Sequence, residues 1–214
     1  MPPPPPTSPQ ALPTPYRQIR ALQDDDADTV TVYQAYNAEI ASQAVARQRL
    51  DASPRFRTTR TWIKPSWCWM MYRAGYSYKD PNQARILALR MRREHFLELL
   101  RRGVLSHDAH RSAAAAVAVN GARDDGDGSK GEAGSMETAA EEEVRIQWDP
   151  ERSARLEKLG YRSIQIGVPA ALQSQWVNEW ITSIEDVTER ARELKRVLDE
   201  EDGSGGAIKD EVLT

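Results

Sequence analysis

The chain contains a single cysteine, Cys68, and only three histidines, His95, His107 and His110. One cysteine excludes an intramolecular disulfide and a cysteine-based zinc cluster, and this usage is typical of a reducing compartment. Of the histidines, only His107 and His110 approach a helical metal-ligand spacing, and they lie in a segment whose composition argues against order. We therefore expect no metal site.

Long hydrophobic runs are also missing. No stretch approaches the roughly 18 apolar residues of a membrane span, and the N-terminus opens with prolines instead of a basic segment followed by an apolar run. We expect an intracellular protein, cytoplasmic or nuclear, without a membrane partner. No Ser-His-Asp triad, phosphate-binding glycine loop or helix-turn-helix pattern can be drawn from the sequence. Motifs alone therefore do not identify a reaction.

Charge is nearly balanced, with 29 basic and 32 acidic residues among 214 and a formal net charge of −3. This balance gives no general attraction to nucleic acid or to an anionic membrane. The signs are nevertheless unevenly spread, since arginines gather at 47–60 and 85–102 and acids gather at 24–28 and 141–143. Local arginine clusters in an acidic chain can still hold a phosphate-rich ligand.

Three segments have compositions typical of disorder. Residues 1–15 hold eight prolines, residues 106–142 pass from an alanine run into Gly, Asp, Ser, Lys and Glu, and residues 201–214 are rich in glycine and acids. Such segments bury too little apolar surface to fold. The remaining chain, at 40% hydrophobic residues overall, is long enough for one core. We therefore expect one domain over 16–200, interrupted by a disordered insertion at 106–142.

Apolar periodicity predicts alternating strands and helices before the insertion. Strands are expected at 29–36, 60–64 and 85–91, because apolar and other residues alternate there. Helices are expected at 37–50, 66–74 and 94–102. Asn37 and Ser66 are suitable N-caps, and Gly75 and Gly103 are suitable ends.

After the insertion, strands are expected at 143–148 and 162–168. A short helix is predicted between them at 150–159, with Asp149 as its cap and Pro150 at its first position. A second helix is predicted from Pro169, with Trp176, Val177, Trp180 and Ile181 on one face, and a last one from a capping box at 186–189 to about residue 198. The mixture of short and long connections favours an α+β fold, with a mixed or antiparallel sheet and flanking helices.

The segment 61–76 is the strongest candidate for a site, because it sets Lys64, Ser66 and Arg73 among tryptophans and tyrosines. Buried charges must be paired or used, so we interpret this segment as one wall of a pocket. Lys64 and Ser66 flank Pro65 at a strand-to-helix junction. The ammonium, the hydroxyl and the free N–H groups of the helix can therefore converge on an anion such as phosphate. The alternative is that Ser66 only caps the helix while Lys64 lies along Trp62.

Further candidates lie at strand ends and on one strand face. The 161–167 strand places Arg162, Ile164 and Ile166 on one face and the polar Ser163 and Gln165 on the other, which suggests a polar face toward a cleft. Asp149 and Arg152 are expected to serve structure, as a helix cap and its partner. Together, the candidate catalytic residues are Lys64, Ser66 and Gln165. The candidate ligand-binding residues are Arg17, Arg20, Tyr33, Gln34, Tyr36, Tyr72, Arg73, Arg162 and Ser163.

Six blocks of sequence resemble the domain-of-unknown-function family 4291. This family implies no established reaction. The blocks are Arg17-Gln-Ile-Arg20, Val32-Tyr-Gln-Ala-Tyr36, Thr61-Trp-Ile-Lys-Pro-Ser66, Trp69-Met-Met-Tyr-Arg-Ala-Gly75, Gln147-Trp-Asp-Pro-Glu-Arg152 and Tyr161-Arg-Ser-Ile-Gln-Ile-Gly167.

A more distant resemblance is to NAD-dependent ADP-ribosyltransferases, which use an early Arg or His, a Ser or Tyr and a late Glu. Arg20, Ser66 and Gln165 occupy comparable places. Gln165 departs from that pattern because an amide cannot act as the carboxylate that steadies an oxocarbenium-like centre. The resemblance therefore implies NAD as the cofactor and requires another acid, such as Asp149 or Glu151.

These observations lead to three hypotheses. The first is a nucleotide- or phosphate-binding cleft, with transferase activity on NAD. The second is a non-catalytic RNA-binding module, in which arginines contact phosphates and aromatic residues stack on bases. The third is a scaffold that binds a partner through its C-terminal helices.

Overall fold

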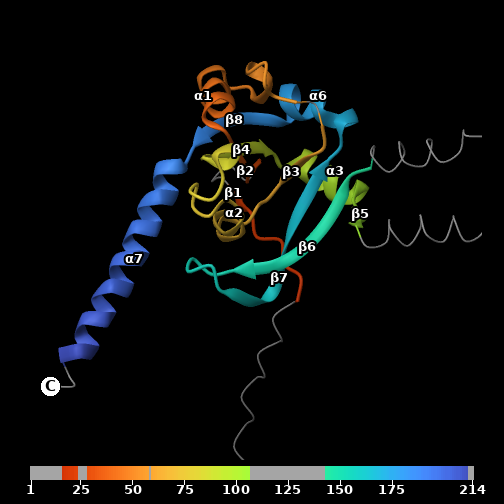
Figure 1. The fold of residues 1–214 in the computed structure, drawn as a ribbon. Coiled ribbons are helices and arrows are strands. Elements are labelled where there is room, and N and C mark those ends of the chain that lie inside the picture. Colours follow the sequence, from red (N-terminus) through yellow and green to blue (C-terminus); the bar gives the residue numbers. More distant parts are fainter. Residues whose placement is uncertain (1–15, 24–27, 58, 107–142, 212–214) are drawn as a thin grey trace, which may run out of the picture.

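The computed structural model of the chain describes residues 16–23, 28–57, 59–106 and 143–211, with side chains to 203. The predictions for 1–15 and for the insertion fall outside these residues, apart from Ser106 in the insertion. The described residues form two four-stranded sheets with helices packed around them (Figure 1). The α+β fold predicted from the sequence is confirmed.

The first sheet is antiparallel and has the order β1-β2-β4-β8. Its strands are β1 (Leu22–Gln23), β2 (Thr29–Tyr36), β4 (Arg85–Arg92) and β8 (Ile181–Asp186). The two central strands β2 and β4 are buried along most of their length, as expected for apolar runs that are covered on both faces.

The second sheet is mixed and has the order β3-β7-β6-β5. It contains β3 (Thr61–Ile63), β7 (Lys158–Val168), β6 (Arg145–Arg152) and β5 (Val104–Leu105), of which only β5 runs parallel to its neighbour. A β-bridge joins the two sheets, since the Tyr33 N–H donates to the Lys64 carbonyl at 2.7 Å. The bridge brings the end of β3 beside the middle of β2.

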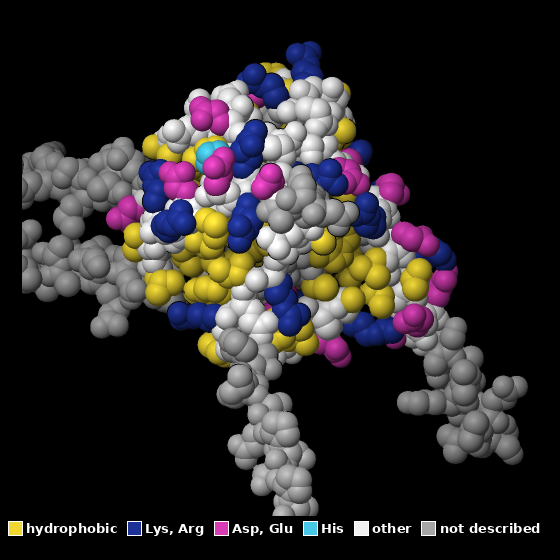
Figure 2. All heavy atoms as spheres, turned by 180° about the vertical axis from the view of Figure 1, so that it is seen from behind, with side chains coloured by type: hydrophobic (Ala, Val, Ile, Leu, Met, Phe, Trp, Pro, Cys, Tyr) yellow, Lys and Arg dark blue, Asp and Glu magenta, His cyan; other side chains and the backbone are white. Residues whose placement is uncertain are grey.

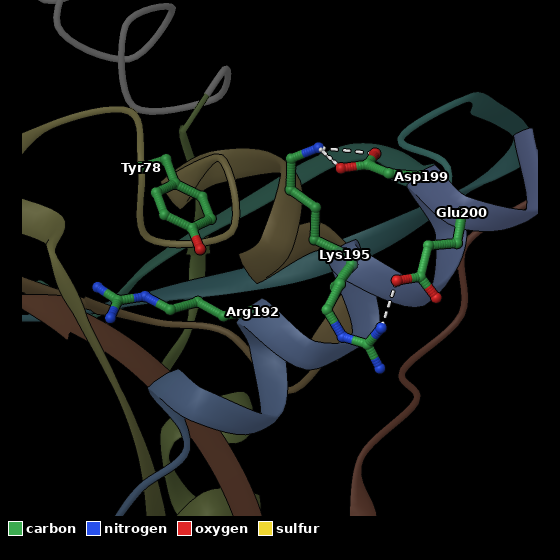
Figure 3. Close-up of a pocket in the computed structure, with 6 residues that line it drawn as sticks. Tyr78, Arg192, Lys195, Asp199 and Glu200 are labelled. Carbon is green, nitrogen blue, oxygen red and sulfur yellow. Dashed lines mark hydrogen bonds and ion pairs between the residues drawn. The ribbon is translucent and has the colours of Figure 1, made fainter. Parts of the chain in front are cut away.

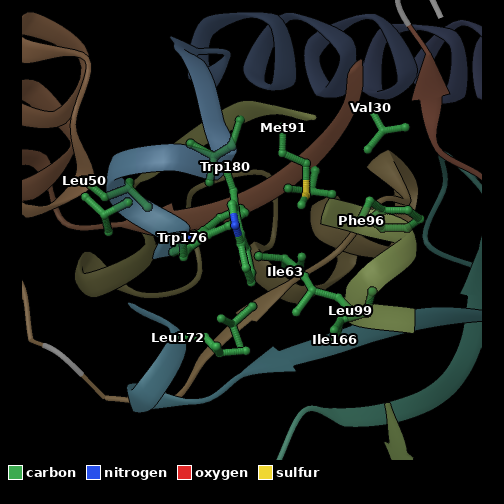
Figure 4. Packing of buried hydrophobic residues seen from close by; sticks show 14 of the residues in the cluster. Val30, Leu50, Ile63, Met91, Phe96, Leu99, Ile166, Leu172, Trp176 and Trp180 are labelled. Carbon is green, nitrogen blue, oxygen red and sulfur yellow. The ribbon is translucent and has the colours of Figure 1, made fainter. Parts of the chain in front are cut away.

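The main core fills the space between the sheets and the helices (Figure 4). Ile166 of β7 and Ile63 of β3 enter it from the second sheet, and Leu99 enters from α3 (Arg93–Arg102). Trp176, which is fully buried, packs in the same cluster. Alternation along β7 explains the arrangement, because every second side chain points into this core and the others point to the opposite face.

Two helices begin where side-chain caps were predicted. Asn37 Oδ1 accepts from the Ile40 N–H at 3.0 Å and starts α1 (Ala38–Arg47). Ser66 Oγ accepts from the Trp69 N–H at 3.1 Å and starts α2 (Trp67–Ala74). Gly75 ends α2 with a φ of 55°, a conformation that glycine adopts without strain.

The helix predicted at 150–159 is wrong. Strand β6 continues through Pro150 to Arg152 and turns back into β7, and Asp149 lies within the strand instead of capping a helix. Pro150 lacks an N–H for the ladder, and the pairing register shifts between Pro150 and Arg152. Between the ladder pairs of these two residues lie one residue of β6, Glu151, and three residues of β7, 159–161, so the Asp-Pro pair precedes an irregular part of the ladder.

The helix predicted from Pro169 is only partly correct. A 3₁₀ turn (Ala170–Leu172), the short α6 (Gln173–Gln175) and a π-helical turn (Trp176–Trp180) follow one another, and Ile181 then begins β8. The helical periodicity of the sequence did not predict this strand. Pairing of β8 with β4 outweighs the helical periodicity that would have placed Ile181 beside Trp180.

The last helix, α7 (Thr188–Glu211), runs beyond the predicted end and projects from the body (Figure 1). Its first turns are anchored, because Val187 and Ala191 are buried in a second core cluster with Met70 and Met71 of α2. The tip of the β6–β7 hairpin also contacts it through Arg155, whose guanidinium pairs with Glu201. In the described part of the chain, no helix is long and apolar enough to cross a bilayer.

The surface carries both signs of charge intermingled, and hydrophobic side chains gather across the lower half of the face seen in Figure 2. Recognition of a charged ligand therefore depends on local groups more than on the field of the whole molecule.

Candidate functional site

A pocket of about 440 Å³ lies where the N-terminus of α2 meets the end of β6. It lies beside the bridge between the sheets, since Tyr33 of β2 and Pro65 both line it. The residues that line it are Arg20, Ala21, Leu22, Tyr33, Pro65, Ser66, Trp67, Cys68, Glu151, Arg152 and Tyr161. The pocket thus combines cations, a carboxylate, a hydroxyl and aromatic rings.

Ser66 and Glu151 form a buried pair on the pocket wall. Ser66 Oγ donates to Glu151 Oε1 at 2.9 Å, and the two residues are 6% and 4% exposed. The same carboxylate oxygen accepts from the Arg152 backbone N–H at 2.8 Å. Ser66 also caps α2, as one of the two interpretations of the sequence expected. Alternation along β6 places Glu151 on the same face as Gln147 and Asp149, toward this helix.

Two arginines contribute positive charge. The Arg152 guanidinium lies 3.8 Å from the ring centre of Tyr72, and its Nη1 donates to the Leu156 carbonyl at 3.2 Å. Its Nε is buried and has no hydrogen-bond partner among the described residues. Arg20 is exposed and lies 4.7 Å from the ring centre of Tyr161. Stacking holds both guanidinium groups in place beside the pocket.

Aromatic rings form the remaining walls. Tyr33 and Trp67 meet edge to face, with ring centres 5.3 Å apart. Burial raises the pKa of Tyr33, so its hydroxyl remains a neutral donor at physiological pH. Tyr161, half-buried, lies on the other side beneath Arg20. Such rings are suitable surfaces for a planar base.

Lys64 is buried next to this pocket but does not line it. Its Nζ lies 3.4 Å from the Trp62 carbonyl oxygen and 5.2 Å from the ring centre of Trp69. Burial, and then the charge of Arg73, lowers the pKa of Lys64 from 10.5 to about 8, while Asp149 raises it in part. The structure therefore brings Ser66 to the pocket and directs Lys64 toward the Trp69 ring.

The polar face predicted for β7 is present. Gln165 Nε2 donates to Asp149 Oδ2 at 2.7 Å, and Gln147 Nε2 donates to Asp149 Oδ1 at 2.9 Å. Ser163 is buried and lies opposite Asp149 in the strand register. Both predicted polar residues therefore face the side of the sheet away from the main core. Asp149 is held by these amides, and Arg152, its predicted partner, stacks on Tyr72 instead.

The other predicted residues lie outside the pocket. Gln34 Nε2 donates to Thr61 Oγ1 at 2.5 Å, and the Tyr36 hydroxyl donates to Gln34 Oε1 at 2.9 Å, so both serve the junction of the sheets. Arg73 is exposed and donates to Gln83 Oε1 at 3.2 Å. Arg17 and Arg162 line a separate pocket of about 310 Å³.

Sequence reasoning missed Arg152, Trp67 and Tyr161 as lining residues and named Glu151 only as an alternative acid. The helix assigned to 150–159 concealed Glu151 and Arg152. The alternation that begins at Val144 would have revealed Glu151 if it had been followed past Pro150, because a strand there carries Glu151 onto the face of Gln147 and Asp149.

A different pocket, of about 460 Å³, lies against α7 (Figure 3). Its charges already satisfy one another: Lys195 Nζ bonds Asp199 at 2.7 Å, and Arg196 pairs with Glu200 and Glu193. Exposed ion pairs of this kind along one helix are typical of a solvated surface. The pocket beside Ser66 is therefore the better candidate.

We expect Lys64→Met to stabilise the protein at neutral pH by about 1–3 kcal/mol, since a buried ammonium is replaced by a side chain of similar length. The folded-state pKa lies below the unfolded one, so between about pH 8 and 10.5 the unfolded chain binds more protons. Wild-type stability should therefore rise with pH across this window relative to the variant. Urea unfolding at several pH values measures the difference, and a variant that is less stable than wild type at pH 7 would contradict the assignment.

Comparison with known proteins identifies a family, but the description of that family names no reaction. No curated protein matches the chain, and the resemblance to ADP-ribosyltransferases receives no support from the family that does match. Residues 18–211 match the family described as Domain of unknown function (DUF4291), and the chain belongs to that family.

Proposed function

We propose that the pocket beside Ser66 binds a nucleotide and that NAD is its ligand. The observation that carries this proposal is the buried Ser66–Glu151 pair in a pocket that also holds two stacked arginines. Burial of a carboxylate costs free energy. A ligand that interacts with this carboxylate would offset part of that cost. A nucleotide offers hydroxyls to the carboxylate, phosphates to the arginines and bases to the rings.

Each part of a dinucleotide has a matching group. Arg20 and Arg152 supply positive charge for the pyrophosphate, since a guanidinium attracts phosphate oxygens and donates to them. Trp67 and Tyr161 offer ring faces and edges to a base. Glu151 accepts from the ribose hydroxyls or faces the anomeric carbon. The acid that Gln165 could not provide is thereby supplied by Glu151.

The arrangement suits cleavage of the nicotinamide–ribose bond. The bond between C1′ and the ring nitrogen breaks, the electron pair leaves with neutral nicotinamide, and positive charge develops on the ribose. The Glu151 carboxylate stabilises that charge, while the Ser66 hydroxyl fixes the carboxylate by donating to it. Water or an acceptor hydroxyl then bonds to C1′ and passes its proton to solvent water.

Binding is tested by isothermal titration of NAD into the wild type and into Arg20→Ala and Trp67→Ala. We expect both variants to weaken NAD binding about tenfold, since each loses one contact of about 1.4 kcal/mol. Arg196→Ala is the matched control, because Arg196 is an exposed arginine paired with carboxylates on α7. Equal affinity in all four proteins, or no heat with NAD at all, rejects the proposal.

A further inference from the structure

Four arginines near the pocket lie over aromatic rings instead of pairing with acids. Arg17 lies 5.6 Å from the ring centre of Trp148. Arg162 lies 5.7 Å from the ring centre of Tyr16, and its Nε donates to the Tyr16 hydroxyl at 2.7 Å. The other two pairs are Arg20 with Tyr161 and Arg152 with Tyr72. Among the residues that the structure describes, no ion pair joins any of the four arginines to a carboxylate. Their charge is thus available to a ligand.

The four pairs, which we call the arginine–aromatic strip, are linked through the paired chain segments 16–20 and 161–162. A β-bridge joins residue 17 to 162, with the Gln18 N–H donating to the Arg162 carbonyl at 2.9 Å. Tyr161, next in the chain to Arg162, lines the candidate pocket together with Arg152. The pocket of Arg17 and Trp148 and the pocket of Arg20 and Tyr161 therefore lie on either side of one short segment.

The two arginine-rich runs seen in the sequence differ from the strip, because several of their arginines form ion pairs. From 47–60, Arg49 pairs with Asp51 at 2.8 Å and Arg55 with Glu39 at 2.9 Å. From 85–102, Arg85 pairs with Asp186 and Arg102 with Glu98. Ion pairing reduces the charge that these four arginines can offer. The strip, which composition did not single out, is the better phosphate-binding surface.

We propose that the arginine–aromatic strip binds a single-stranded nucleic acid. Alternating guanidinium groups and aromatic rings match a strand in which phosphates alternate with unstacked bases. Tyr16 is 60% exposed and Tyr72 is 37% exposed, so both offer ring surface to a base. A duplex hides its base faces and gains only from the charges, so single strands are preferred. Arg20, Arg152 and Tyr161 of the strip also line the proposed NAD pocket, but strand binding does not require NAD.

Fluorescence anisotropy of a labelled oligouridylate, without NAD, tests this inference. We expect Arg17→Ala with Arg162→Ala to weaken binding about tenfold at low salt and to reduce the slope of log affinity against log salt by about 1.4. Each phosphate contact contributes about 0.7 to that slope for a single strand. Because Arg162 Nη1 also bonds the Trp148 carbonyl, Arg17→Ala alone serves as a second variant with a smaller loss of the same kind.

Two further variants separate stacking from general electrostatics. Tyr16→Ala removes a ring and no positive charge, and it should weaken binding about fivefold with little change in the salt slope. Arg49→Ala with Arg55→Ala removes two positive charges elsewhere and should change affinity less than Arg17→Ala with Arg162→Ala does.

An equal loss in this control, equal affinity for a duplex, or stronger binding to anionic phospholipid vesicles would overturn the inference. So would no binding to an oligouridylate or an oligodeoxythymidylate at low salt. Failure of NAD titration affects only the proposed function, because the strand is measured in the absence of NAD.

Discussion

Glu151→Gln is expected to lower the rate of NAD cleavage about 100-fold, while NAD still binds. The substitution keeps the shape of the side chain and an oxygen that accepts from Ser66, but it removes the negative charge that faces the developing positive charge on the ribose. Loss of one well-placed electrostatic group typically costs this much in turnover. The effect is measured as the rate of nicotinamide release, which chromatography detects under single-turnover conditions.

The control for this experiment is Glu157→Gln. Glu157 lies in the same hairpin and is exposed, and its carboxylate accepts from Ser153 at 3.3 Å, away from the pocket lining. It should retain full activity. If Glu151→Gln cleaves NAD as fast as the wild type, the carboxylate has no role in the chemistry, whatever its effect on binding.

Trp176→Ala is expected to reduce the free energy of unfolding by about 3–5 kcal/mol, because it leaves a large cavity in the main core. Trp176 is fully buried and belongs to the cluster that includes Ile63, Leu99 and Ile166. Urea unfolding followed by circular dichroism measures the change, with the slope against urea checked for constancy.

Trp176→Phe provides the informative comparison. The Nε1 of Trp176 is buried without a hydrogen-bond partner among the described residues, so the indole pays a desolvation cost that it does not recover. Phenylalanine loses some volume but removes that donor. We expect less than half the destabilisation of the alanine variant. Equal losses would show that the donor is satisfied in solution.

Strands and caps were predictable where local periodicity and packing agree. Strand β2 (Thr29–Tyr36) has the predicted ends, and Asn37 and Ser66 cap helices as expected. A side chain that bonds a backbone N–H three residues away acts locally, so its role is visible in the sequence.

The errors arose where distant pairing decides the structure. Pro150 resembles the first residue of a helix, but the partner strand β7 keeps it extended. Ile181 continues the apolar face of the predicted helix, but it pairs with Met91 of β4 and therefore lies in a sheet. Both outcomes depend on residues far away in the sequence, which periodicity does not consider.

In the candidate site, too, local interactions were predictable and interactions between distant residues were not. Ser66 was identified from its position before a helix, whereas Glu151, 85 positions later, becomes its partner only through the fold. The placement of Lys64 beside Trp69 and away from the pocket also depends on tertiary packing.

Ser66 forms two hydrogen bonds through a single oxygen, and this restricts which residues can replace it during evolution. Its oxygen accepts from the backbone of α2 and donates to Glu151 at the same time. Asparagine or aspartate would preserve the cap, but aspartate would place a second negative charge beside Glu151, and alanine would lose both bonds. Threonine is the one common substitute that keeps an acceptor and a hydroxyl donor together. Selection for a stable helix and selection for an oriented carboxylate thus act on a single atom, and neither can be relaxed alone.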